Sequence, residues 1–120
     1  MKRDLELVKR ILETVEAANP EQRADLTPLR VEYGDDIVSR HIELMHEAGL
    51  VHGVFMRSEG SLVNNRTKIN KILWPGHDYL AATREPRVWN RLKQHAETAT
   101  FQAMIEAGRE LTRRLLLGEL

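Results

Sequence analysis

The residues best suited to acid–base or metal chemistry in this sequence are its histidines. His41 and His46 are five positions apart, so they do not stack on one helical face as an i, i+4 pair would. No His-Glu-x-x-His motif accompanies them. His41 also falls within an apolar stripe, where a hydrogen-bonded core histidine is the simpler interpretation. We therefore expect no metal site.

A second candidate is the adjacent pair His77 and Asp78, which follows Trp74 at the start of an expected helix. One hypothesis is a site that pairs imidazole with carboxylate. The other is structural: Asp78 satisfies amides of the helix N-terminus, and His77 packs at the base of a hairpin. On the structural hypothesis, His77, Trp74 and Trp89 form a core joint between the hairpin and the C-terminal helices.

Nucleophilic catalysis has little support in the sequence. There are no cysteines, no Gly-x-Ser-x-Gly motif and no glycine loop able to cradle phosphate. We therefore predict that the protein is not an enzyme, has no catalytic residues and uses no cofactor.

The last chemistry to consider is the binding of phosphate groups by basic side chains. Such side chains cluster in two places, both outside the expected helix 35–48. That helix itself carries four carboxylates against one arginine, which opposes phosphate attraction. Alternatively, both basic clusters are simply solvated faces. The residues that we predict to contact DNA are Arg40 and His46 on the helix, Asn64, Asn65, Arg66 and Lys68 on a hairpin, and Arg87 and Arg91 as secondary phosphate contacts.

Hydrophobic periodicity and turn signals predict the elements that must position these residues. A short extended piece is expected at 29–33, and Asp35 or Asp36 is expected to cap the following helix, which Gly49 ends. Two strands are expected to form a hairpin with a basic tip. In chain order we predict a helix over 3–19, the extended piece, a helix over 35–48, strands over 50–56 and 69–74, and helices over 76–83, from Pro86 onwards and over 99–117.

This order predicts an α+β fold, mostly α: a winged helix-turn-helix-like domain with a β-hairpin wing and a C-terminal helical extension. We expect residues 1–83 to form the winged-helix-like part and residues 84–120 the extension packed on it, as a single domain. The segment Ser39 to Val51 resembles the recognition helix and first wing strand of winged-helix regulators.

Three blocks in order are similar to a bacterial and prophage family, the domain-of-unknown-function 2513 family: residues 1–8, Ala48-Gly49-Leu50-Val51, and residues 73–80 with Trp89 after them. The resemblance covers nearly the whole chain. It implies a winged-helix-like fold in a bacterial or phage cytoplasmic protein, and it carries no activity with it. Leu73 stands where the family usually has a capping Thr, a loss of roughly 1 kcal/mol.

Composition limits the class of protein further. The 120 residues hold 18 basic and 18 acidic side chains, and the longest apolar run is Leu115-Leu116-Leu117, far below a membrane span. We expect a cytoplasmic protein without a membrane partner.

The apolar stripe of the last helix predicts either a homodimer through that helix or packing against helix 3–19. The stripe consists of Phe101, Met104, Ile105, Gly108, Leu111 and Leu115.

The sequence thus predicts a DNA-binding winged-helix protein, a transcriptional or phage-lifestyle regulator. The alternative is a non-enzymatic protein-interaction module that uses the same scaffold, binds a host or phage protein and never touches DNA.

Overall fold

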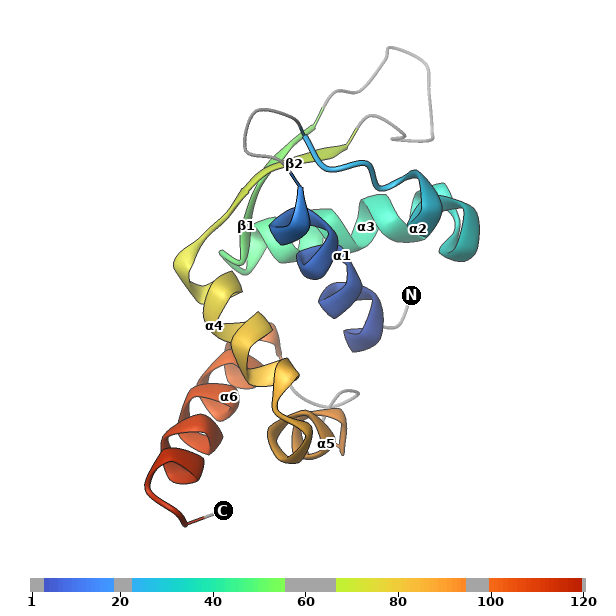
Figure 1. Cartoon of the computed structure of the whole chain (residues 1–120). Coiled ribbons are helices and arrows are strands. Elements are labelled where there is room, and N and C mark those ends of the chain that lie inside the picture. The colour runs from blue at the N-terminus through green and yellow to red at the C-terminus, as the bar shows by residue number, and fades with distance from the viewer. Residues whose placement is uncertain (1–3, 19–22, 56–66, 95–99, 120) are drawn as a thin grey trace.

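The computed structural model describes residues 4–18, 23–55, 67–94 and 100–119 of the chain. The described part is α+β and mostly helical, with an antiparallel hairpin near one end (Figure 1). Its elements are α1 (Leu5–Ala17), α2 (Thr27–Tyr33), α3 (Asp35–Glu47), β1 (Val51–Val54), β2 (Lys68–Ile72), α4 (Trp74–Arg84), α5 (Pro86–Gln94) and α6 (Phe101–Leu116).

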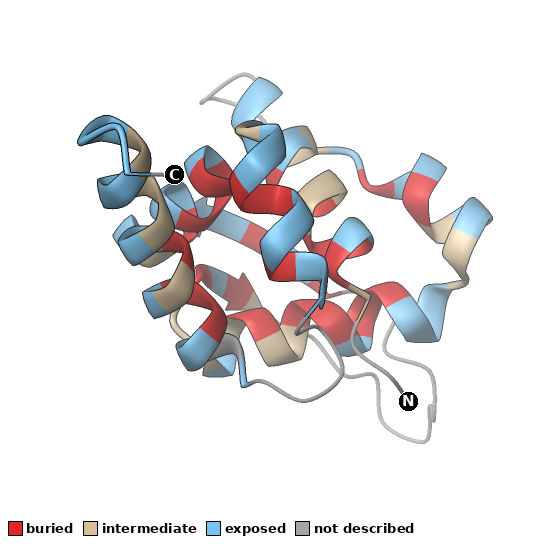
Figure 2. Cartoon of the chain, turned by 90° about the horizontal axis from the view of Figure 1, so that it is seen from below, coloured by how far each residue is buried: buried red, intermediate tan, exposed pale blue. Residues whose placement is uncertain are grey.

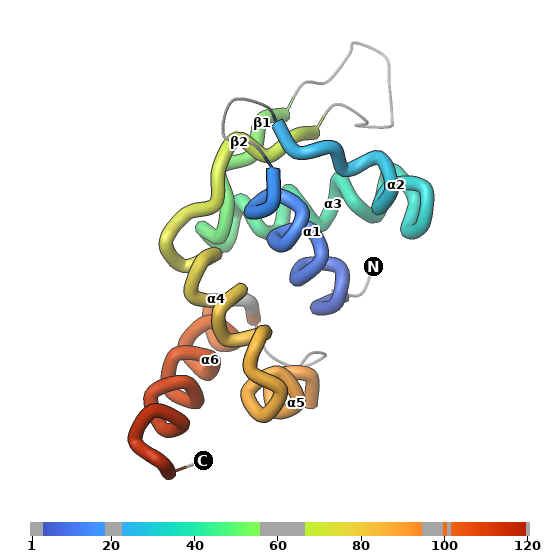
Figure 3. Tube along the Cα trace, viewed as in Figure 1, coloured from blue at the N-terminus to red at the C-terminus, as the bar shows by residue number. Residues whose placement is uncertain are grey.

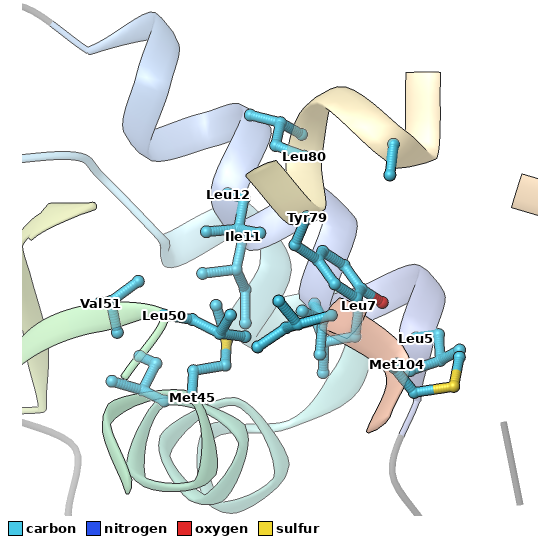
Figure 4. Packing of buried hydrophobic residues seen from close by; sticks show 14 of the residues in the cluster. Leu5, Leu7, Ile11, Leu12, Met45, Leu50, Val51, Tyr79, Leu80 and Met104 are labelled. Atoms are coloured by element: carbon cyan, nitrogen blue, oxygen red, sulfur yellow. The ribbon is translucent and has the colours of Figure 1, made fainter. Parts of the chain in front are cut away.

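Helix α1 is the centre of the core. Asp4 caps it, because its carboxylate accepts the Leu7 N–H at 3.1 Å. The hydrophobic periodicity that predicts this helix is confirmed, since its buried residues fall on one side, and α1 contacts α3, β2 and α4. Figure 4 shows the α1 side chains meeting those of α3, β1 and α4 in one cluster. The cluster includes Leu7, Ile11, Leu12, Met45, Leu50, Tyr79 and Leu80, each at most 1% exposed.

His41 is a hydrogen-bonded core histidine, as predicted. Its side chain is fully buried, its Nε2 accepts the Asp4 N–H at 2.9 Å, and its Nδ1 lies 2.8 Å from the Ile37 carbonyl oxygen. Because Nε2 accepts a bond, the ring proton sits on Nδ1 and is donated to Ile37. This neutral ring joins the start of α1 to α3.

The prediction of an extended piece over 29–33 is wrong: these residues belong to helix α2. Pro28 stands in the first turn, where its missing N–H is tolerated. Leu29 is buried and Tyr33 packs against the core, whereas Val31 is 81% exposed. Residues four apart share a helix face, so the burial of Leu29 and Tyr33 follows from a helix as readily as from alternation.

Arg30 fastens α2 to its neighbours. Its guanidinium donates to the Ser39 hydroxyl of α3 at 2.9 Å and to the Thr67 carbonyl, just before β2, at 2.7 Å. The side chain is only 14% exposed and also lies 3.8 Å from an Asp35 carboxylate oxygen. Charge-assisted bonds in a sheltered site are stronger than those between neutral groups, so Arg30 fixes where β2 begins relative to α2 and α3.

Helix α3 begins differently from the prediction and ends as predicted. Gly34, with φ 98°, occupies the N-cap position, and Asp35 and Asp36 lie in the first turn instead of capping. At the other end Gly49 has φ 77°, a left-handed conformation that favours glycine. Asp35 and Asp36 still suit the first turn, because carboxylates there face the positive end of the helix dipole.

The hairpin closes at a tight junction around Leu50. The Leu50 N–H donates to Met45 at 2.9 Å, and its carbonyl oxygen accepts the Leu73 N–H at 2.9 Å. A Cβ added to Gly76 would lie 2.1 Å from that same oxygen. Only glycine at the start of α4 therefore allows α3, the hairpin and α4 to meet here.

Helices α4, α5 and α6 pack together below α1 in the view of Figure 3. Helix α6 packs mainly on α4 and α5 rather than on α1, with Met104, Ile105 and Gly108 buried. Figure 2 shows its outer side exposed. At its C-terminal end Leu116 is 82% exposed, and the predicted homodimer through this helix stays a prediction.

Two structural predictions for the start of α4 are wrong. Asp78 does not cap the helix; its carboxylate is 2.9 Å from Arg109 Nη2 and ties α4 to α6. Trp74 opens α4 instead of ending β2 and is 81% exposed, so only Trp89 of the expected core joint is buried. His77 keeps an edge contact with Trp74, with ring centroids 6.1 Å apart. Pro75 in the first turn removes one of the amides that a side-chain cap would otherwise satisfy.

Across the described ranges, none of the helices is both long and apolar enough to cross a lipid bilayer.

We predict that Gly76→Ala lowers the free energy of unfolding by at least about 2 kcal/mol, because the new methyl group collides with backbone rather than with a flexible side chain. Urea denaturation measures the change. Ala81→Ser, at an exposed site on the same helix, is the control and should stay within about 0.5 kcal/mol. Equal stability of the two variants would contradict the tight junction.

We predict that Arg30→Met lowers the free energy of unfolding by about 1–3 kcal/mol and speeds hydrogen exchange along β2, because the charged bonds are lost while the stem is kept. Arg40→Met is the matched control: it removes an exposed α3 arginine and should cost less than about 1 kcal/mol. If β2 exchanges at the same rate in both variants, Arg30 does not hold the hairpin.

Candidate nucleic-acid interface

The outward face of α3 is acidic. Asp36 and Glu47 are exposed, and the guanidinium of Arg40 is engaged within the helix, where its Nη1 lies 2.8 Å from Glu43 Oε2. The structure thus places the predicted DNA contact Arg40 on the surface, but beside a carboxylate. Carboxylates repel phosphate, so this face opposes DNA backbone contact.

His46, the other contact predicted on α3, is directed toward the hairpin. Its Nδ1 accepts the Gly53 N–H at 3.0 Å, and its ring meets those of His52 and Phe55 edge-on, at 5.9 and 5.1 Å between centroids. The imidazole therefore joins the end of α3 to β1.

The hairpin strands present a basic, acid-free surface. Lys68 and Lys71 of β2 are exposed, and the sequences of β1 and β2 contain no carboxylate. Lys68 thus lies where the sequence predicted it, on a strand that faces solvent. The predicted contacts Asn64, Asn65 and Arg66 lie outside the described residues.

Two grooves border β2, and Arg23 lines both. At the start of β2, Arg23, Arg30 and Lys68 line a groove of about 380 Å³ together with Asp25. Farther along β2, Arg23, Asn70, Lys71 and His77 are among the residues around a hollow of about 280 Å³, which Glu16 also lines. We call Arg23, Lys68, Asn70 and Lys71 the β2 surface.

Sequence reasoning missed Arg23. It stands in the connector ahead of α2, where neither periodicity nor a motif points to it, and only the folded chain brings it to the hairpin. A lone arginine followed by Asp25 also gives no basic cluster in the sequence.

The remaining predicted contacts, Arg87 and Arg91, lie on the exposed side of α5. The opposite side of the helix is buried through Val88, Trp89 and Leu92. The amines of Lys9 and Lys93 lie 5.0 and 5.4 Å from the centre of the Trp89 ring, within cation–π range. We call Lys9, Arg87, Arg91 and Lys93 the α5 surface.

The structure does not bring these two basic surfaces together. Figure 1 places the hairpin at one end of the molecule and α5 at the other, with α1 between them. The predicted secondary contacts on α5 therefore belong to a separate surface from Lys68.

Most other described arginines are neutralised by carboxylates. Arg10 pairs with Glu32, Arg84 with Glu16 and Arg109 with Asp78. On α6, the Arg113 guanidinium, supported by Arg114, lowers the pKa of Glu110 to about 2. By contrast Lys68, Lys71, Arg91 and Lys93 form no ion pair with residues in the described ranges. Positive charge is thus available to an external anion at these four side chains, two on the β2 surface and two on the α5 surface.

A third feature lies beside α3. Glu43, His46, Glu47 and Phe55 line an open hollow of about 450 Å³, in which Phe55 is 36% exposed. Its lining is acidic and aromatic. Among the residues that the structure describes, no three histidine or acidic side chains gather in a way that could hold a metal ion.

Comparison with known proteins agrees with the resemblance noted in the sequence. The chain is 28% identical over 118 residues to an uncharacterized protein of Haemophilus influenzae, an alignment that covers 97% of this chain and 96% of that protein. No solved structure matches the chain. Residues 2–102 match the family described as "Hypothetical protein (DUF2513)", and the chain belongs to that family.

Proposed function

We propose that this protein is a non-enzymatic, winged-helix DNA-binding protein that acts in the bacterial cytoplasm as a transcriptional or phage-lifestyle regulator. The observation that carries the proposal is the β2 surface, an exposed basic strip beside two strands that contain no carboxylate. The order α1, α2, α3, β1, β2 supports the winged-helix part of the proposal, because in a winged helix a hairpin reaches the DNA backbone beside a helix.

The hairpin, rather than α3, leads the contact. Phosphates supply essentially all of the non-specific affinity for DNA, and they are attracted by Lys68, Lys71 and Arg23 and repelled by the carboxylates of α3. His46, whose Nδ1 accepts the Gly53 N–H, then acts as a positioning residue for the hairpin, whereas Arg40 is paired with Glu43 within α3.

The grooves beside β2 fit this role because they add donors to the charge. Asn70 contributes an amide between the two lysines, and His77 an imidazole at the base of the hairpin. Amide and imidazole N–H groups donate to phosphate oxygens, which fixes the register of a protein on a duplex without reading its sequence.

We predict that Lys68→Ala/Lys71→Ala weakens binding of a random-sequence duplex about tenfold at about 50 mM salt and reduces the slope of log affinity against log salt by about two, because two phosphate contacts are lost. Fluorescence anisotropy measures both quantities, and thermal melting checks that the variant is folded.

The comparison variant is Arg40→Ala. We expect it to bind like the wild-type protein, because its guanidinium is already paired. A large loss in Arg40→Ala with none in the lysine variant would assign the contact to α3 instead. If the wild-type protein does not bind the duplex at low salt, the proposed function is wrong.

The hollow beside α3 favours a second candidate function, the recognition of a basic protein. Its acidic rim and its partly exposed aromatic ring suit a segment that carries both lysine or arginine and an apolar side chain. On this hypothesis the winged helix is a scaffold and DNA is not bound.

For this candidate we predict that Glu47→Lys/Phe55→Ala loses at least about 90% of the proteins captured from nuclease-treated host lysate, since both the charge and the aromatic anchor are removed. Glu13→Lys/Leu117→Ala makes matched changes at exposed sites elsewhere and should capture normally. Equal capture by both variants, measured by quantitative mass spectrometry, would exclude the hollow as a protein-binding site.

A further inference from the structure

The solvent side of α5 carries only positive and neutral polar groups between Pro86 and Gln94, and the Glu85 carboxylate lies just before the helix, where it accepts the Arg87 N–H at 3.2 Å. Helix α5 contains three cations and no carboxylate, and its solvent side is formed by Arg87, Asn90, Arg91, Lys93 and Gln94. Its other side is closed against the protein by Val88, Trp89 and Leu92, so the cations cannot turn inward. The helix thus displays a fixed row of charge.

Helix α1 adds to this row. The Lys9 amine lies 5.0 Å from the centre of the Trp89 ring, on the same indole that Lys93 approaches at 5.4 Å. Two ammonium groups are therefore held beside one ring, although like charges repel. The indole face attracts both cations and offsets part of that repulsion.

Contrast with α6 shows that this arrangement is not a general feature of the chain. On α6, Glu110 pairs with Arg113 and Arg114, which cancels their charge locally. Neither Arg91 nor Lys93 has such a partner within the described ranges. Cations without counter-charges, as Arg91 and Lys93 are within those ranges, match a polyanion in charge.

We propose that the α5 surface is a second DNA-binding surface, which lets one molecule bridge two duplex segments. The proposal rests on the proposed function for its ligand and adds a second, separate point of attachment. The hairpin and α5 lie at opposite ends of a molecule whose longest dimension is 53 Å. A duplex held at the hairpin therefore leaves the α5 surface open.

The contact at α5 is with the DNA backbone. Arg87, Arg91 and Lys93 follow one another along nine residues of helix, and guanidinium and ammonium groups bind phosphate oxygens through charge-assisted hydrogen bonds. Asn90 and Gln94 supply neutral donors between them. Such contacts carry no sequence information, so the second segment is bound irrespective of its sequence.

The test is a bridging assay. A biotinylated random-sequence duplex is fixed to streptavidin beads, protein is added, and retention of a free, fluorescein-labelled duplex is measured. We expect the wild-type protein to retain the labelled duplex and Arg91→Ala/Lys93→Ala to reduce retention at least fivefold, roughly the effect of losing one to two phosphate contacts. The matched control Arg113→Ala/Arg114→Ala also removes two cations and should retain it normally.

The outcomes separate this inference from the proposed function. If wild-type protein binds the fixed duplex but retains no labelled one, or if Arg91→Ala/Lys93→Ala retains it fully, α5 is not a second DNA-binding surface. If Lys68→Ala/Lys71→Ala retains the labelled duplex as well as the wild-type protein does, the hairpin is not one of the two points of attachment and the hairpin-led function is wrong.

A third arm tests for an acidic protein as the ligand of α5. Retention of the protein on immobilised poly-glutamate is compared with retention on the duplex beads. If Arg91→Ala/Lys93→Ala weakens only the binding to poly-glutamate, the surface recognises acidic protein and the DNA assignment is overturned. Melting curves of all variants confirm that each is folded.

Discussion

The arrangement of this protein depends on one close approach, that of Gly76 to the carbonyl of Leu50. Leu50 ends the turn after α3, its side chain is completely buried, and its carbonyl accepts the first amide that follows β2. Because no side chain separates the two backbones, α3, the hairpin and α4 meet at one tight junction. This junction fixes the position of the hairpin relative to the protein core. Arg30 fixes the start of the second strand through its hydrogen bond to the Thr67 carbonyl.

The packing of the hairpin also explains why the charged side chains of β2 face solvent. The hairpin packs on α3 and α1 through Val51 and Ile69, so Lys68 and Asn70, which alternate with Ile69, face solvent. Lys71 is exposed as well, beside the irregularity in the register between His52 and Gly53. Exposed lysines on a strand oppose edge-to-edge pairing with another strand. The proposed function assigns phosphate contact to the same two lysines. The stability of the hairpin and its proposed role therefore favour the same residues.

Much of the fold is predictable from sequence because its signals are local. The α1 stripe, Gly49 after α3, Pro75 and Pro86 in the first turns of their helices, and the apolar side of α5 all follow from periodicity and backbone preference. The region around α2 was mispredicted because Leu29, Val31 and Tyr33 alternate and are β-prone, while the tertiary contacts of Arg30 hold a helix. Seven residues are too few for periodicity to distinguish the two structures.

The candidate site was less predictable, since its members come from distant parts of the chain. Lys68 and Arg87 could be found as members of basic clusters, but that the clusters occupy opposite ends is a property of the fold alone. Arg23 reaches the hairpin from a connector, and Arg40 is engaged by a neighbour one helical turn away. Charge in a sequence shows how many cations exist, whereas only the fold shows which of them are already paired.

The two tryptophans of the chain differ in solvent exposure, so they can serve as two distinct intrinsic fluorescence probes. Trp74, directly after the hairpin, is 81% exposed, whereas Trp89, beneath the outer row of α5, is 8% exposed. An exposed indole emits at longer wavelength and is reached by iodide, while a buried one is shielded from both water and quencher. Fluorescence from the base of the hairpin and from α5 can therefore be read separately in the unlabelled chain.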